Sequence, residues 1–162
     1  MTGFHRHSLL GLFFVALFVQ ASHAQIPAQV RLADVQRLKC AFTLMAVGTW
    51  DKDVPSAEVT PAKLSIQFDA IDTQDGTANV VEVSASAAGA PHITVRLLGD
   101  NLHLMAMNIS GSVYITTVFS DRESRAGAKF KAVHTRHEFT QIRLTGWTSR
   151  PEQYYGQCEI VK

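Results

Sequence analysis

SVYITTVFSDRESRAGAKFKAVHTRHEF, residues 112–139, is the stretch that decides the fold. Two β-rich segments, Val113–Phe119 and Ala128–Phe139, flank a charged turn at residues 120–127. β-branched and aromatic residues are frequent in both segments, and nothing between them favours a long helix, so the stretch predicts a β-hairpin. The second segment also carries the most unusual polar cluster of the chain: His134, Arg136, His137 and Glu138.

Short β-like segments continue on both sides of this hairpin. Residues 63–69 alternate cleanly, with Leu64, Ile66 and Phe68 on one face, which is typical of a sheet with one side in water. We expect strands at Cys40–Trp50, Lys63–Asp69, Ala78–Ser84, His92–Leu98, Leu102–Ile109, Val113–Phe119, Ala128–Phe139, Thr140–Trp147 and Tyr154–Val161. Asp51–Pro61 is expected to be a charged, proline-containing connection, and Ser149–Pro151 is expected to break the last pair.

These connections are too short for parallel crossovers, so the fold class is all-β, with an antiparallel meander of about eight strands. The meander forms either a closed, calycin-like barrel or a two-sheet sandwich over residues 40–162. Residues 25–39 form a lead-in or a short helix, because Leu32, Val35 and Leu38 recur at helical spacing. The mature length fits one domain.

The N-terminus has the three parts of a secretory signal peptide over residues 1–24. Arg6 gives a short basic region, Leu9–Val19 is apolar, and Ser22 and Ala24 fit the small-residue rule for cleavage after Ala24. The apolar run would rise only about 16 Å as a helix, too short for a hydrocarbon core of roughly 30 Å. We therefore expect an exported protein, periplasmic or extracellular, with no membrane span after cleavage.

The charge balance excludes the partners that bind through electrostatics. The whole chain has 15 Lys and Arg against 14 Asp and Glu, and removing the leader deletes Arg6 alone, which leaves no net charge. Nucleic acid and anionic membrane surfaces are therefore not expected as partners.

The two cysteines, Cys40 and Cys158, lie near the two ends of the mature domain. In an exported chain an even count predicts a disulfide, and only one pairing exists. The bond would suit a barrel in which the first and last strands meet.

The faces of the segment 128–139 follow from its lysines. Lysines are rarely buried, so Lys129 and Lys131 should mark the solvent face, and His134, Arg136 and Glu138 should then point inward. Arg136 is then expected to pair with Glu138 in a self-satisfied polar plug at one end of the barrel. The alternatives are that the phase flips at a bulge, or that Arg136 lies at the barrel mouth and meets a ligand carboxylate there. His134 and His137 lie three apart on a strand and point to opposite faces, so no metal site is predicted.

Gly48-Thr49-Trp50, on the first strand, resembles the G-x-W signature of lipocalins and the related calycin barrels. Trp50 is accordingly expected to be a core aromatic residue.

Longer pieces, GTW (48–50), TTVF (116–119), AVHTRHEF (132–139) and RPEQYYGQCE (150–159), resemble those of an uncharacterised family of small exported bacterial proteins. The resemblance covers most of the mature chain. It implies export and a shared fold, and it carries no activity or site.

Three functions compete. The first is a barrel that binds an apolar or amphipathic small molecule, and the second is an envelope structural or protein-interaction module. The third is a small enzyme, although G-x-S-x-G, H-E-x-x-H, Walker and C-x-x-C motifs are absent, and no catalytic residue, metal or cofactor is predicted. An interior cavity favours the first function, and a filled barrel with an apolar outer patch favours the second. The candidate ligand-binding residues are Trp50, His134, Arg136, Glu138, Tyr154 and Tyr155.

Overall fold

The computed structural model describes residues 31–83, 92–107, 111–120, 129–142 and 146–161, with side chains for all of these except 82–83, 138–142 and 146–150. The expected leader, residues 1–24, and most of the expected charged turn at 120–127 lie outside the described residues.

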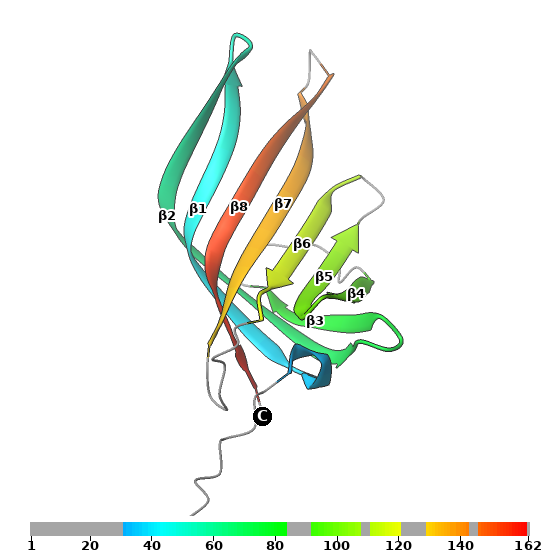
Figure 1. Ribbon diagram of the computed structural model, residues 1–162. Coiled ribbons are helices and arrows are strands. Elements are labelled where there is room, and N and C mark those ends of the chain that lie inside the picture. The colour runs from blue at the N-terminus through cyan, green and yellow to red at the C-terminus, as the bar shows by residue number, and fades with distance from the viewer. Residues whose placement is uncertain (1–30, 84–91, 108–110, 121–128, 143–145, 162) are drawn as a thin grey trace, which may run out of the picture.

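Eight antiparallel strands follow one another around a closed sheet, and the last strand pairs with the first (Figure 1). The predicted antiparallel meander of about eight strands is thus confirmed, with the strand pairing of a closed barrel. The β3–β4 seam is the shortest ladder, with two residue pairs. The strands are β1 (Leu38–Asp51), β2 (Val54–Asp72), β3 (Thr77–Val83), β4 (Ile93–Leu98), β5 (Asn101–Met107), β6 (Val113–Val118), β7 (Phe130–Ile142) and β8 (Gly146–Ile160).

The core forms because every second side chain of each strand points into the ring. Leu64, Ile66 and Phe68 of β2 are buried, as their alternation predicts. Phe130 of β7 is buried while Lys131 is exposed, which confirms the phase derived from the lysines. The inward residues of all eight strands join in one continuous hydrophobic core, whose most completely buried members include Leu38, Phe42, Val95, Leu102, Leu104 and Val118.

The predicted disulfide is present between Cys40 of β1 and Cys158 of β8. The two cysteines are direct cross-strand partners, and both side chains are fully buried. Gly156, two residues before Cys158, allows this close approach, because a Cβ there would lie 2.6 Å from the Cα of Phe42. The bond therefore locks the seam that closes the ring.

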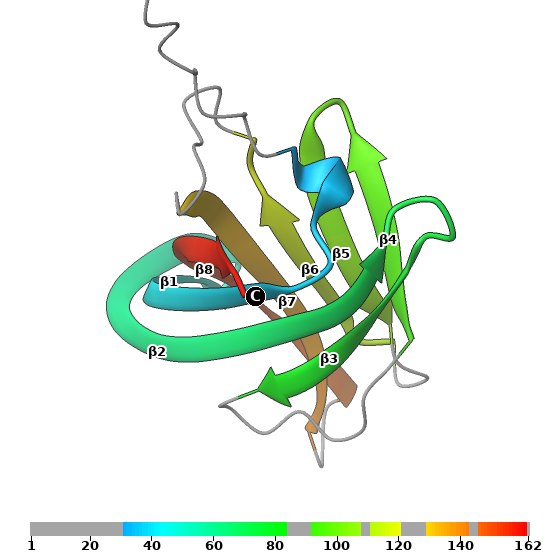
Figure 2. The same cartoon turned by 90° about the horizontal axis from the view of Figure 1, so that it is seen from below.

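Residues 31–37 form a lead-in that contains only one short 3-10 helix, η1 (Leu32–Asp34). Leu32 and Val35 are buried in the core cluster, so the helical spacing identified the buried residues. Backbone bonds from Ile71 to Gln36 and from Val161 to Arg37 hold the lead-in across the lower end of the ring (Figure 2).

Two long hairpins, β1–β2 and β7–β8, extend beyond the shorter strands β3 to β6 (Figure 1). We call the extended, four-stranded part of the sheet, in the order β2-β1-β8-β7, the arm.

The prediction that Asp51–Pro61 is a loop is wrong, because β2 starts at Val54 and the turn has only two central residues. Lys52 and Asp53 both have positive φ, 47° and 69°, as a tight type I′ turn requires. The turn lacks the glycine that marks most such turns in a sequence.

The predicted break at Ser149–Pro151 is also wrong, because β8 runs without interruption from Gly146 to Ile160. Pro151 pairs with His137 of β7, whereas the ladder with β1 ends one residue away, at Glu152. A proline is tolerated at that position because one side of the strand no longer needs a donor.

The inward face of β1 changes phase along the strand, because the strand contains an irregularity. Register shifts between Phe42 and Leu44 relative to both neighbouring strands, as a β-bulge at Thr43 produces. Phe42 is buried, but Leu44 is 41% exposed on the outer face. Trp50 shares the outer phase and is 62% exposed, so the expectation of a core tryptophan is wrong.

Candidate functional site

Polar side chains meet on the inner face of the sheet, where the closed ring passes into the arm. Cross-strand register brings them together: Thr116 of β6 lies opposite His134 of β7, and His134 lies opposite Tyr154 of β8. One step further along, Arg136 lies opposite Glu152. We call these residues the inner polar cluster.

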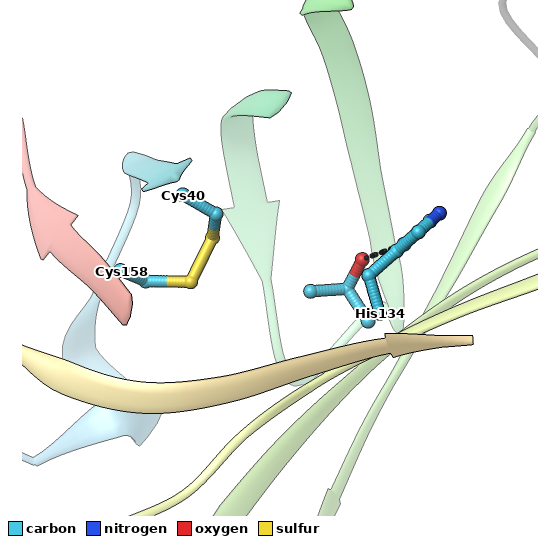
Figure 3. The surroundings of a disulfide bond; sticks show 4 residues. Cys40, His134 and Cys158 are labelled. Atoms are coloured by element: carbon cyan, nitrogen blue, oxygen red, sulfur yellow. Dashed lines mark hydrogen bonds between the residues drawn. A yellow bond between two sulfur atoms is a disulfide. The ribbon is translucent and has the colours of Figure 1, made fainter. Parts of the chain in front are cut away.

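His134 is the most enclosed member of the cluster, at 6% exposure. Its Nδ1 lies 2.8 Å from Oγ1 of Thr116 (Figure 3). The rings of Phe42, Tyr154 and Tyr114 surround it, with centroids 5.8, 6.0 and 6.5 Å away. Burial, together with the smaller effect of the positive charge of Arg136, lowers the pKa of His134 to about 4. The imidazole is therefore neutral at pH 7.

Glu152 connects the two other polar members of the cluster. Nε of Arg136 lies 3.2 Å from Oε2 of Glu152, and the hydroxyl of Tyr154 donates a 2.8 Å hydrogen bond to the same oxygen. This ion pair joins Arg136 to the neighbouring strand β8, and the expected pairing with Glu138 stays a prediction. The side chain of Glu138 lies outside the described residues.

The chemistry of the cluster is largely that of a closed network. The carboxylate of Glu152 neutralises Arg136 and accepts from Tyr154, and the neutral His134 is engaged by Thr116. Of these groups, the side chain of Arg136 is the one with appreciable access to solvent, 26% against 9% for Glu152. The arrangement matches the polar plug considered from the sequence.

Metal binding has no support in the part of the chain that the structure describes. His134 points inward and His137, three residues later, lies on the opposite face, as strand geometry predicts. No group of three or more His, Cys, Asp or Glu side chains within the described ranges is close enough to hold a metal ion.

The other two candidate residues, Trp50 and Tyr155, lie on the outside of the arm. Tyr155 is 40% exposed and pairs with Leu44, while Trp50 pairs with Pro55 at the tip of the first hairpin.

The outward residues of the four strands of the arm lie together on one surface, because the bulge in β1 and the register between the strands align them. We call it the uncharged outer face, and it consists of Val133, Thr135 and His137 of β7, Pro151, Gln153 and Tyr155 of β8, Leu44, Ala46, Gly48 and Trp50 of β1, and Pro55, Ala57, Val59 and Pro61 of β2.

No residue of this surface is Asp, Glu, Lys or Arg, and several of its apolar side chains are widely exposed. Val59 is 60% exposed. Charged residues border the surface at both ends: Lys63 and Lys131 lie toward the ring, and Asp51, Lys52 and Asp53 lie at the tip. An exposed apolar patch with a polar rim marks an interaction surface more often than ordinary protein exterior.

Two prolines lie on the edge strand β2 beside this face and hinder the pairing of a further strand there. Residues 54–65 pair with β1, and the ladder with β3 starts only at Ile66, so this side of β2 has no partner among the described residues. Proline is tolerated in a sheet where its nitrogen faces away from a neighbouring strand, which places those of Pro55 and Pro61 on the free edge. Both remove a donor that a docking strand would need, so the edge is poorly suited to sheet extension.

The structure thus separates the six predicted residues. His134, Arg136 and Tyr154 meet inside, Trp50 and Tyr155 lie outside, and Glu138 has no described side chain. Sequence reasoning missed Glu152 and Thr116 of the inner cluster, and the bulge that turns the apolar residues of β1 outward. The alternation of Glu152 and Tyr154 on one face was a usable signal for the first, but only the register with β7 shows which residues they meet.

Comparisons with known proteins give no family. No protein-family model matches the chain, and no curated protein matches it. Within the described residues, no helix is long and apolar enough to cross a membrane.

Proposed function

We propose that this chain is an exported interaction module that docks on another protein surface through the uncharged outer face. The observation that carries the proposal is the concentration of exposed apolar side chains on one side of the arm, at Leu44, Trp50, Val59 and Tyr155. Burying such side chains against a partner gains about 25 cal/mol per Å² of apolar surface, before the costs of association.

The packing of the interior also supports an interaction module. The inward side chains of the ring pack into one continuous core, and Glu152 links Arg136 and Tyr154 within the inner polar cluster. One continuous hydrophobic core combined with an apolar outer patch supports an interaction module over a carrier of small molecules.

Site-specific photo-crosslinking in the native host tests docking directly. A photoreactive amino acid at position 59 should give crosslinked protein adducts, because Val59 belongs to the proposed surface, halfway along it on β2, and is 60% exposed. The matched control is position 81 on β3, where Val81 is exposed to almost the same extent, 58% against 60%, but lies outside the face. Adducts at neither position, or equally at both, would contradict the proposal.

Export is part of the proposal. The signal peptide at residues 1–24, the resemblance to small exported bacterial proteins and the buried disulfide support it, because disulfides persist in oxidising compartments. Intact-mass measurement of protein recovered outside the cytoplasm should give a chain that begins at Gln25. A chain that retains Leu9–Val19 would contradict cleavage.

Binding of an amphipathic small molecule is the second candidate, and the partial exposure of Arg136 favours it. A carboxylate could meet the guanidinium from the open side of the arm, with its apolar chain along Met45 and Ala62 on the same inner face. Calorimetry with decanoate as the probe tests this function. The wild type should bind, and Arg136→Lys should bind more weakly at equal stability, since lysine lacks the bidentate geometry. An absence of heat with the wild type rejects decanoate-like acids.

A further inference from the structure

We infer that a second copy of this chain occupies the uncharged outer face, packed sheet against sheet about a two-fold axis. This inference rests on the proposed function, since it names the partner of the same surface. Three features of the described residues favour a copy of the chain over an unrelated protein: the absence of charge on the face, the arrangement of charges around it, and its size.

The absence of charge makes the face compatible with itself. In a two-fold interface each residue near the axis meets its own counterpart, so a charged residue there would face a like charge. The central residues of the face, Ala46, Val59 and Gln153, form one cross-strand row and carry no charge. The whole chain has a net charge of only +1, so two copies do not repel each other strongly at long range.

The charges at the border are complementary in one orientation. A two-fold axis that lies between the sheets and perpendicular to the strands places the tip of one arm over the base of the other. The tip of one copy, which carries Asp51, Lys52 and Asp53 and therefore a net negative charge, would then approach Lys63 and Lys131 at the base of its partner, and all five residues are exposed. The opposite orientation would bring tip to tip and base to base, with like charges together. The border therefore selects antiparallel stacking.

The size of the face fits a weak, reversible dimer. Four strands about 4.8 Å apart, with outward residues about 6.7 Å apart along each strand, give a flat area of about 450 Å² per copy. Two copies would bury about 900 Å² before side-chain relief is counted, which lies in the class of weak and transient interfaces. The prolines on the free edge of β2 direct association to the face and away from edge-to-edge pairing.

Sedimentation velocity of the mature, disulfide-bonded protein over a dilution series tests the inference. The wild type should pass reversibly from monomer to dimer. Val59→Glu should weaken dimerisation at least roughly tenfold, because it places two like charges in the interface. Val81→Glu, the matched control, should dimerise as the wild type does. A wild type that stays monomeric throughout, or equal dimerisation of both variants, would overturn the inference.

A second measurement avoids any dependence on how the variants fold. Equal amounts of ordinary and ¹⁵N-labelled chains, each with the photoreactive residue at position 59, are crosslinked after mixing. Copy-to-copy docking should give crosslinked peptides that combine the two labels and join position 59 to other residues of the face. Joins elsewhere, or none, overturn the inference. If only a different protein is crosslinked in the host, the docking function stands and the second copy is rejected; if neither forms, both fail.

Discussion

Acid should destabilise this protein through one residue, His134. Its side chain is buried among aromatic rings, and burial lowers its pKa in the folded protein to about 4 from an ordinary 6.5. Below pH 6.5 the unfolded chain therefore binds a proton that the folded chain does not accept, and the free energy of unfolding falls with pH. The fall stops near pH 4, where the folded form also takes up the proton.

The magnitude follows from these two pKa values. Between pH 7 and pH 5 the free energy of unfolding should decrease by about 2 kcal/mol, and the complete loss by pH 4 should be about 3 kcal/mol. His134→Gln removes the titrating group and keeps a neutral side chain that can hydrogen-bond to Thr116. The variant should lose little stability between pH 7 and pH 5, so the wild type and the variant should differ in slope.

Urea denaturation followed by circular dichroism at several pH values measures both curves. Asp34 and Asp69 have lowered pKa values, caused mainly by the Arg31 side chain and by the backbone N–H of Ala70, respectively. Stability linked to these carboxylates is lost only as the pH falls below about 4, and it is lost equally in both proteins. Parallel curves for wild type and His134→Gln from pH 7 to pH 5 would refute the argument.

Substitutions at three other places in the fold, the disulfide, Gly156 and the Arg136–Glu152 pair, test the packing. Replacing both Cys40 and Cys158 by alanine should lower the free energy of unfolding by about 5 kcal/mol, on the loop-entropy model for a separation of 118 residues. The loss is measured from the fall in the urea midpoint. A loss of less than about 1 kcal/mol would mean that the bond does little to restrict the unfolded chain. Gly156→Ala should destabilise the fold by several kcal/mol, roughly, because its Cβ would collide with the backbone of β1, and an unchanged melting temperature would contradict that contact. Glu152→Gln should lower the free energy of unfolding by about 1–3 kcal/mol, which is less than the loss from breaking a fully buried ion pair, because Arg136 remains partly exposed. The double variant Arg136→Met with Glu152→Leu should lose less stability than Glu152→Gln alone, because it leaves no unpaired charge. Equal losses for those two variants would contradict the paired network.

The strand residues themselves determined much of this fold. Alternation over Leu64, Ile66 and Phe68 defines a buried face before any tertiary contact is known, and exposed lysines fix the phase of β7. Short connections exclude parallel crossovers and leave an antiparallel meander. The two cysteines admit only one pairing, which also predicts that the first and last strands meet, as they do at Cys40 and Cys158.

Tertiary structure decided which residues meet across strands and which way the arm faces. Arg136 pairs with Glu152, which is 16 residues away in the sequence, because the register of β7 with β8 places Glu152 directly opposite. The bulge at Thr43 reverses the phase of β1 and turns Leu44 and Trp50 outward. Neither event has a local signature, because register and bulges arise from the fit of one strand to its neighbours and from the burial of whole faces. The amino-acid sequence therefore determines the elements and the closure of the sheet, and the packing between strands decides where its polar and apolar surfaces lie.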